Sequence, residues 1–95
     1  MTRVELTELA RQDLAFLIRT RELPEELTHV RVEKVVGQLE LFPELGQAIA
    51  GRYPGARSVL VAWDWFSLLY HFFEADDHVV GISFFDSRTH HAPLP

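Results

Sequence analysis

The C-terminal half of the chain contains three successive apolar runs of strand length, at residues 57–63, 65–74 and 78–85. They are rich in valine, phenylalanine and tryptophan, which favour β-strands. A Trp-Asp turn separates the first two runs, and the acidic segment 74–77 separates the second from the third. Because connections this short join antiparallel neighbours, the runs predict a three-stranded antiparallel meander.

Two helices are predicted before this meander. Thr7 is suited to the N-cap of the first helix, which runs to about Arg21. Pro24 suits the first turn of the second helix, and Pro43 ends it. The apolar residues of the first helix share one half of its circumference, at Leu9, Ala10, Leu14, Phe16, Leu17 and Ile18. The buried stripe of the second helix is expected at Val32, Val35, Val36, Leu39 and Phe42.

The remaining segments complete an α+β fold. Residues 3–6 alternate polar and apolar, as in a short strand, and residues 47–56 are expected to form a loop with room for one helical turn at 47–50. The predicted order is an N-terminal strand, a helix hairpin and the meander, in a single domain spanning residues 1–95 whose tail, 89–95, is mobile.

The two faces of this sheet differ in composition. One face can pack fully on the helices, whereas the other is mixed and suits solvent or a partner. In the third run, strict alternation sets one row against another: Val80, Ile82 and Phe84 against Val79, Gly81, Ser83 and Phe85.

Charge and composition limit the classes of partner. Fourteen acidic and nine basic residues give a net charge of −5, and Lys34 is the one lysine. Nucleic-acid binders usually present a basic field, because phosphate neutralisation supplies much of their affinity, so a protein partner suits this chain better. The chain has no cysteine, which excludes disulfides and thiol chemistry.

Membrane, metal and cofactor roles are also not expected. No apolar run reaches membrane-spanning length, which predicts a cytoplasmic protein. The adjacent His90 and His91 lack the spacing and the third ligand of a metal site. The sequence contains no glycine-rich phosphate loop, so no cofactor is predicted.

Asp13 lies inside the apolar half of the first helix. A buried carboxylate needs a partner, so Asp13 is either at the edge of that face or paired with an arginine. Arg57 is the first candidate for this pair and Arg3 the second, and the ion pair would tie the helix to the sheet. Arg57, at the head of a strand, has the alternative role of contacting an anion or a protein partner.

Other residues of the meander also have open alternatives. His71 could act as an acid or base, or serve only in packing. Tyr70 is most simply a core aromatic with its hydroxyl at the sheet edge, which is a structural role. Trp63 and Trp65 flank a turn: if exposed they form a contact patch, and otherwise they cap the end of the sheet.

Several segments of the chain together carry a family resemblance. They are Leu6-Thr-Glu-Leu-Ala10 followed by Asp13-Leu14, then Leu39-Glu-Leu-Phe-Pro43-Glu-Leu-Gly46, Arg57 at a strand start, Phe66-Ser-Leu-Leu-Tyr70 and Gly81-Ile-Ser-Phe-Phe-Asp-Ser-Arg88. In this order and spacing the chain, over about residues 3–88, resembles the RelE/ParE superfamily of toxins from bacterial toxin–antitoxin modules, and ParE more closely.

This resemblance implies both a fold and a partner. The fold is a helix hairpin on a curved antiparallel sheet, with the N-terminal strand joining the sheet edge. The partner is a cognate antitoxin whose C-terminal segment wraps the toxin and neutralises it. ParE-like members poison DNA gyrase, whereas RelE-like members cut ribosome-bound mRNA with a basic cluster on the sheet and an aromatic residue or histidine near the C-terminus.

The first hypothesis is a ParE-like toxin of a type II toxin–antitoxin (plasmid stabilisation) module that acts by protein binding on a gyrase-type target. The residues expected to contact partners are Trp63, Trp65, Arg57 and Arg88, and exposed aromatic side chains would also suit a homodimer. The alternative is a ribosome-dependent mRNA endoribonuclease, whose catalytic candidates are Arg57, His71, Arg88 and His90. RNA cleavage needs a base, a cation for the phosphate and an acid, so convergence of these four residues would favour it. A family member without toxicity, acting as a binding module, is the third hypothesis.

Overall fold

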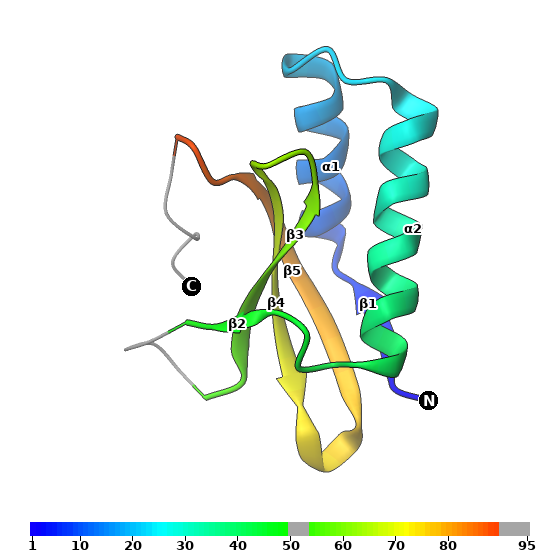
Figure 1. The fold of residues 1–95 in the computed structure, drawn as a ribbon, viewed down its shortest axis with the longest axis vertical. Helices are drawn as coiled ribbons and strands as arrows, with labels where there is room; N and C mark the ends of the chain where they lie inside the picture. Colours follow the sequence, from blue (N-terminus) through cyan, green and yellow to red (C-terminus); the bar gives the residue numbers. More distant parts are fainter. Residues whose placement is uncertain (50–53, 90–95) are drawn as a thin grey trace.

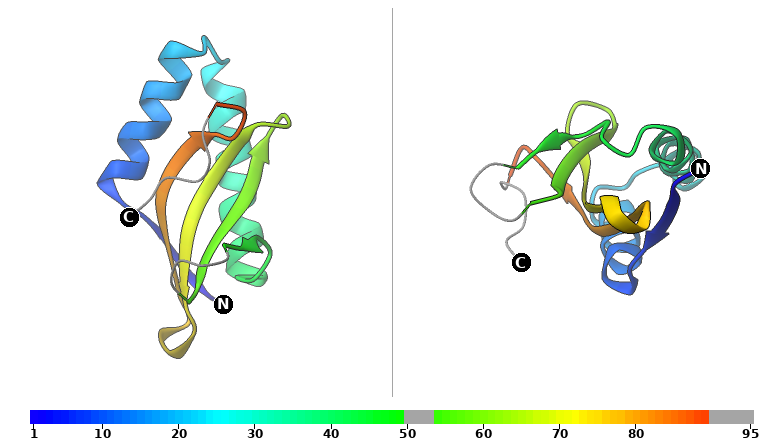
Figure 2. Two further views of the ribbon diagram at one scale, coloured as in Figure 1. Left: turned by 90° about the vertical axis from the view of Figure 1, so that its left-hand side faces the viewer. Right: turned by 90° about the horizontal axis from the view of Figure 1, so that it is seen from below.

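The computed structural model describes residues 1–49 and 54–89. Both helices lie on the same face of a five-stranded sheet, as Figures 1 and 2 show. This is the predicted α+β architecture. The elements are β1 (Arg3–Leu6), α1 (Glu8–Thr20), α2 (Glu25–Leu41), β2 (Gln47–Ala48), β3 (Ala56–Ala62), β4 (Phe66–Phe73), the 3₁₀ turn η1 (Glu74–Asp76) and β5 (His78–Asp86). Neither helix in the described ranges is long and apolar enough to cross a membrane.

The first strand of the chain lies beside the last. The sheet order is β1-β5-β4-β3-β2. β1 pairs with β5 in parallel, from Arg3↔His78 to Leu6↔Gly81, and every other neighbouring pair is antiparallel. A parallel pair needs a long crossover, which both helices and the strands β2, β3 and β4 supply here. As a result β5 is paired on both sides and occupies the interior of the sheet.

The N-terminal cap of α1 is as predicted, but its buried face is narrower. Thr7 has extended backbone angles, and its Oγ1 accepts a hydrogen bond from the Ala10 N–H at 3.1 Å. The buried residues are Ala10, Leu14 and Leu17, at the i, i+4, i+7 spacing of one helical stripe. Leu9 and Phe16 were expected in the buried half, but they are 55% and 51% exposed. The prediction is wrong for these two residues because α1 packs on the sheet only along that single stripe.

The second helix starts one residue later than predicted and ends one residue earlier. Pro24 is its N-cap and not part of its first turn. Its buried residues are Thr28, Val32, Val35 and Leu39. Phe42, expected at the end of this stripe, is instead 63% exposed. With φ −135° and ψ 76°, it has left the helix, so its side chain no longer points along the buried stripe.

The loop after α2 contains a short strand and not a helical turn. Gln47–Ala48 pairs antiparallel with β3, through Gln47↔Ser58 and Ala48↔Arg57. The expected helical turn at 47–50 is therefore wrong for residues 47 and 48, and residue 50 lies outside the described ranges. At this point Arg57 donates hydrogen bonds to the carbonyls of Glu44 and Gly46, and the Gly46 N–H donates to the Tyr70 hydroxyl, which holds the chain beside β3.

The predicted side-chain rows of β5 are wrong because the strand contains a bulge. Leu69 pairs with Ser83, but the next residue, Tyr70, pairs with Gly81, so Ile82 is an extra residue on β5. One extra residue shifts the alternation, since side chains repeat every two positions. Val79 and Gly81 therefore share the helix-facing side with Phe84, whereas Val80 shares the other side with Ser83 and Phe85.

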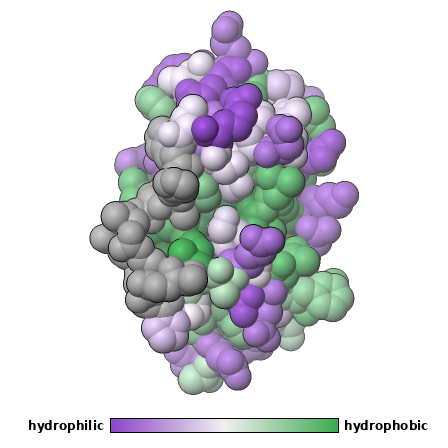
Figure 3. All heavy atoms as spheres, turned by 60° about the vertical axis from the view of Figure 1, so that its left-hand side comes forward, coloured by the Kyte–Doolittle hydropathy of each residue, from purple (hydrophilic) through white to green (hydrophobic). Residues whose placement is uncertain are grey.

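The hydrophobic core lies between the helices and one face of the sheet. Its largest fully buried sheet residues are Phe66, Leu68, Tyr70 and Val79. The other face is mixed, as predicted, but its centre is not open. Ser67, Leu69 and Phe85 are buried there, whereas Leu60 and Phe73 are exposed. Figure 3 shows this side of the molecule, where apolar and polar side chains alternate over the visible surface.

Candidate functional site

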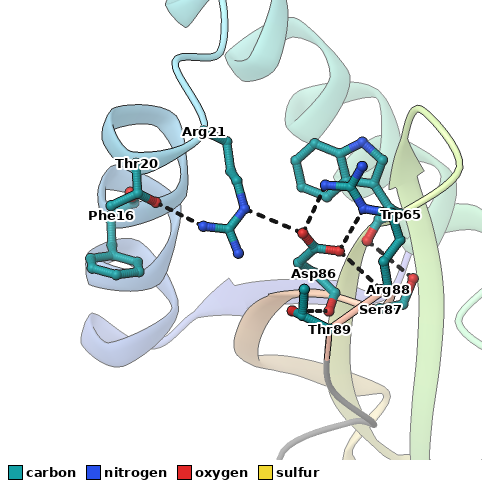
Figure 4. Close-up of polar contacts among 8 residues, drawn as sticks. All are labelled: Phe16, Thr20, Arg21, Trp65, Asp86, Ser87, Arg88 and Thr89. Carbon is teal, nitrogen blue, oxygen red and sulfur yellow. Dashed lines mark hydrogen bonds and ion pairs between the residues drawn. The ribbon is translucent and has the colours of Figure 1, made fainter.

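The carboxylate of Asp86, at the end of β5, is the centre of a charged cluster (Figure 4). Asp86 is only 2% exposed and accepts four hydrogen bonds. They come from Arg21 Nε at 3.3 Å and from the Nε, Nη2 and backbone N–H of Arg88 at 3.1, 2.9 and 2.9 Å. Because Arg21 follows α1, the carboxylate joins the helix hairpin to the sheet. Two guanidinium groups share this one carboxylate, and the Asp64 carboxylate also acts electrostatically on Arg88.

The hydrogen bonds of this cluster shift two pKa values. The side-chain hydrogen bond from Arg88 is the largest cause that holds the pKa of Asp86 well below its usual range, while burial opposes the shift. The same hydrogen bond raises the pKa of Arg88. Asp86 and Arg88 are therefore both charged near neutral pH.

Trp65 and Trp63 form a stacked aromatic pair beside this cluster. The Arg88 guanidinium carbon lies 4.3 Å from the centroid of Trp65, in a cation–π contact. Trp65 is buried, and its carbonyl accepts hydrogen bonds from the backbone N–H and the hydroxyl of Ser87. Trp63 stacks on Trp65 with centroids 5.6 Å apart and is 39% exposed. Trp65 thus caps the end of the sheet, and Trp63 is the member of the pair that offers an exposed ring.

At the other end of β4, Arg57 and Tyr70 hold the loop that follows α2. Arg57 donates from Nη1 to the carbonyls of Glu44 and Gly46, at 3.3 and 2.7 Å, and from Nη2 to the Glu44 carboxylate at 3.2 Å. The Tyr70 hydroxyl donates to the Pro43 carbonyl at 2.8 Å and accepts from the Gly46 N–H at 2.9 Å. Burial is the main cause that raises the pKa of Tyr70. Both side chains therefore have a structural role, since they bind backbone groups of the loop and, for Arg57, also the Glu44 carboxylate.

The expected ion pair of Asp13 with Arg57 or Arg3 is wrong for the residues that the structure describes. Asp13 accepts a hydrogen bond from the Ser83 hydroxyl at 2.7 Å, while Arg57 pairs with Glu44. The reason is topological: Asp13 is on the flank of α1 next to β5, and β4 separates β5 from β3, which carries Arg57. The bond still ties the helix to the sheet, through a hydroxyl in place of a guanidinium.

His71 lies near Arg57 at one end of the sheet. Its ring stacks on Phe73 with centroids 4.1 Å apart and an interplanar angle of 6°. It also packs against Gly55, where an added Cβ would approach the His71 Nε2 to 2.6 Å. His71 and Arg57 border a surface hollow of about 410 Å³, and its lining includes the carboxylates Glu44, Glu74 and Asp76. The hollow therefore has an acidic rim, which disfavours a phosphate.

The four catalytic candidates of the ribonuclease hypothesis do not converge as far as the structure describes them. Arg57 and His71 border one hollow, but Arg88 is bound to Asp86, which pairs with Phe66 at the opposite end of β4. Phe66 and His71 are five positions apart, about 17 Å along a strand. His90 and the predicted mobile tail from residue 90 onward lie outside the described residues. Within residues 1–49 and 54–89, no group of three or more histidine or acidic residues could hold a metal ion.

Sequence reasoning did not single out Asp86 or Arg21. A signal for Asp86 exists, because it directly follows the apolar pair Phe84-Phe85 in a run of strand length. A carboxylate at such a position needs a cation, and Arg88 is two residues away. Arg21 has no comparable signal, since its approach to Asp86 depends on how the helix hairpin packs.

This fold is shared with solved toxin structures. Chains of two toxin–antitoxin complexes each align with 90% of this chain and cover 96% of their own length. In the RelBE2 complex from Mycobacterium tuberculosis the identity is 24% and the TM-score 0.66, and in the intact RelBE complex from E. coli they are 16% and 0.67. The isolated RelE toxin of E. coli aligns with 90% of this chain and 84% of its own, at 14% identity and a TM-score of 0.66.

A metal-bound toxin from Helicobacter pylori is a more distant likeness, at 15% identity and a TM-score of 0.57, over 94% of this chain and 98% of its own. No protein-family model matches the sequence, and no curated protein matches it. The chain therefore has the fold of these solved RelBE and RelE structures, as the sequence resemblance implied.

Proposed function

We propose that this chain is the toxin component of a type II toxin–antitoxin module and that it acts in the ParE-like manner, by binding a protein target such as DNA gyrase. A cognate antitoxin binds and neutralises it in the same compartment, the cytoplasm. The proposal is supported by the fold, which is shared with chains of two toxin–antitoxin complexes and with an isolated toxin.

Protein binding is favoured over RNA cleavage because the guanidinium groups of both candidate arginines are already hydrogen-bonded within the protein. Arg57 is held by two backbone carbonyls and the Glu44 carboxylate, and Arg88 is held by the buried Asp86. A guanidinium whose charge is already balanced offers less to a phosphate in a transition state. The net charge of −5 also favours protein binding over RNA cleavage, because a negatively charged protein repels the RNA backbone.

A specific observation favours the RelE-like endoribonuclease as the second candidate function. Arg57 and His71 border the same hollow of about 410 Å³, so a cation and a titratable group are neighbours on one surface. In that mechanism His71 would be the acid or base and Arg57 the phosphate-binding cation.

Induced expression in bacteria tests these alternatives. The chain is expressed alone or together with the protein encoded by the neighbouring reading frame, and growth, RNA integrity and plasmid supercoiling are measured. We expect growth arrest with intact mRNA and altered supercoiling, relieved by the neighbouring protein. Cleaved mRNA would support the endoribonuclease, and normal growth would leave only a non-toxic binding module.

The exposed ring of Trp63 is where we place a contact with the target. Trp63→Ala should reduce growth arrest, because tryptophan side chains contribute strongly at interface centres. The matched control is Leu41→Ala, since Leu41 is also an exposed apolar residue but belongs to the end of α2 and not to the β3–β4 turn. If both variants arrest growth as the parent chain does, Trp63 is not a contact residue.

A further inference from the structure

The outer side of α2 carries a second row of residues besides the buried one. Its members alternate three and four positions apart, which is the heptad spacing of a coiled-coil seam. Together they form the outer stripe, which consists of Leu27, Val30, Lys34, Gly37 and Leu41. At about 100° per residue, the outer stripe lies across the helix from the buried row of Thr28, Val32, Val35 and Leu39. Figures 1 and 2 show α2 at the edge of the molecule, where the outer stripe is accessible to another chain.

Three residues of the outer stripe are large apolar side chains that the fold leaves in water. Leu27, Val30 and Leu41 are 43%, 57% and 63% exposed. Gly37 adds open space, because a Cβ built there would meet no atom within 4 Å. Apolar side chains exposed at this regular spacing offer a continuous strip that another helix can bury.

The charged residues beside the outer stripe suit a parallel pair of identical helices. With Leu27 at heptad position a, the g positions on one flank are all acidic, at Glu26, Glu33 and Glu40. The e positions on the other flank hold Arg31 and Gln38. Parallel helices bring position g of one chain beside position e of the next heptad of the other, so Glu26 faces Arg31 of a second copy. Antiparallel helices would bring g beside g and oppose acid with acid.

Lys34 is the one charged member of the outer stripe, at a position. In a parallel pair each Lys34 lies beside Glu33 of the other copy, and its methylene stem can cover the seam while the ammonium reaches the rim. A single lysine at such a position lowers the stability of a coiled coil but fixes its register. Within residues 1–49 and 54–89, none of Arg31, Glu33 and Lys34 forms an ion pair, so their charges are available to a second copy.

We propose that the outer stripe binds a second copy of this chain, with the two α2 helices parallel and in register as a short two-stranded coiled coil. Such a pair has two-fold symmetry, so each copy contributes the same surface. The stripe spans residues 27–41, about 21 Å of helix, which makes the association weak and dependent on concentration. The net charge of −5 opposes association only at long range, because physiological salt screens exposed charges beyond about 8 Å. The exposed aromatic side chains that suggested a homodimer from the sequence are not part of this surface, which is aliphatic.

Sedimentation equilibrium of the purified full chain, over about two orders of magnitude in concentration, measures the association. We expect a monomer–dimer equilibrium. Val30→Ser and Leu41→Ser should each raise the dimer Kd at least about tenfold, because each substitution removes two buried apolar side chains, one from each copy. The control is Leu60→Ser, an exposed apolar residue on β3, which should leave the Kd unchanged.

Gly37→Leu tests the same surface by strengthening it. Leucine at a d position favours a two-stranded coiled coil, and the monomer has room for the side chain. We expect the dimer Kd to fall about tenfold or more. Circular dichroism at low concentration shows that this variant and the serine variants are folded as monomers.

The orientation of the two helices has its own readout. Because the chain has no cysteine, a single introduced cysteine reports which residues meet in the dimer. In a parallel pair the same d position of both copies lies within disulfide range, so Val30→Cys should form a cross-linked dimer under mild oxidation. In an antiparallel pair centred on the stripe, the two substituted positions would be about 12 Å apart along the helices, too far for a disulfide. Leu60→Cys is the matched control and should stay monomeric on denaturing gels.

Three results would overturn the proposal. The first is an unmodified chain that stays monomeric at every concentration. The second is an association that Val30→Ser and Leu41→Ser leave unchanged, which would assign the dimer to another surface. The third is a dimer in which Val30→Cys does not cross-link, which contradicts the parallel arrangement. The outer stripe lies on α2 and Trp63 in the β3–β4 turn, so Leu41→Ala changes self-association and leaves the proposed target contact intact. Growth arrest and dimer formation are therefore scored independently.

Discussion

The hydroxyl of Tyr70 has two hydrogen-bond partners, and both are backbone groups of the loop after α2. Tyr70→Phe removes the hydroxyl and leaves the Gly46 N–H and the Pro43 carbonyl unpaired. We expect a loss of about 1–3 kcal/mol in the free energy of unfolding, the usual cost of an unsatisfied buried polar group. Urea denaturation measures this cost.

A control for this prediction is Thr20→Ala. The Thr20 hydroxyl donates one exposed hydrogen bond within α1 and accepts another from Arg21 Nη1, which is also exposed, so its loss should change the unfolding free energy by less than about 0.5 kcal/mol. Equal stability of Tyr70→Phe and the parent chain would show that water replaces the hydroxyl and that the loop does not depend on it.

Asp86 is the residue whose ionisation matters most for stability. Asp86→Asn keeps the size of the side chain but removes the charge that Arg21 and Arg88 share. Because hydrogen bonds to charged groups are stronger than neutral ones, we expect a loss of about 2–3 kcal/mol near neutral pH. The control is Asp76→Asn, in an exposed turn, which should be close to neutral.

The pH dependence of Asp86 follows from the direction of its pKa shift. The folded pKa lies below the unfolded value of about 3.9, so the unfolded state binds the proton first. The stabilisation by Asp86 is complete above about pH 5 and is lost as the pH falls below about 4. The stability difference between the parent chain and Asp86→Asn should therefore shrink on acidification, as urea denaturation over that range would show. A constant difference would mean that another group titrates.

At the scale of elements, periodicity predicted which segments are helices and strands, because it follows from which side of each element is buried. Periodicity gave wrong side-chain positions where a bulge or a helix end interrupts the regular repeat, because neither feature is visible in the sequence pattern. The bulge at Ile82 shifts the inward–outward alternation of the residues after it relative to those before it. The end of α2 before Phe42 places that side chain outside the buried stripe. The partners of Asp13 and Arg57 also depend on the order of strands in the sheet, which local sequence does not encode.

The N-cap of α1 at Thr7 is the clearest local feature that the sequence predicted and the structure confirms. Thr7→Ala removes the acceptor of the Ala10 N–H. It also removes the longer hydrogen bond that the Thr7 hydroxyl donates to the Ile82 carbonyl. We expect a loss of about 1 kcal/mol, typical of an N-cap. Thr7→Ser keeps the oxygen and should recover most of this loss in thermal or urea unfolding. If Ser and Ala are equally destabilising, the methyl group of Thr7 and not its oxygen matters.

For the whole molecule, the decisive feature is that the sheet is complete only when its last strand, β5, is present. β5 is paired with β1 on one side and with β4 on the other, and it also packs against α1. The contacts of β5 with β1 and α1 join residues far apart in the sequence, so these contacts cannot form until most of the chain is available. Without β5, β1 has no strand to pair with, and α1 loses its packing contacts with that strand of the sheet.

A chain that ends at residue 77 should therefore lack a cooperative unfolding transition, although both helices and two strands of the meander remain. Thermal unfolding followed by circular dichroism, together with the dispersion of amide signals in NMR spectra, measures the effect. Adding a peptide of residues 78–89 should restore both the transition and the dispersion, because the missing strand supplies its pairing in trans. A cooperative transition in the shortened chain would show instead that the helix hairpin and β3–β4 form a stable core by themselves, with β5 docking onto it afterwards.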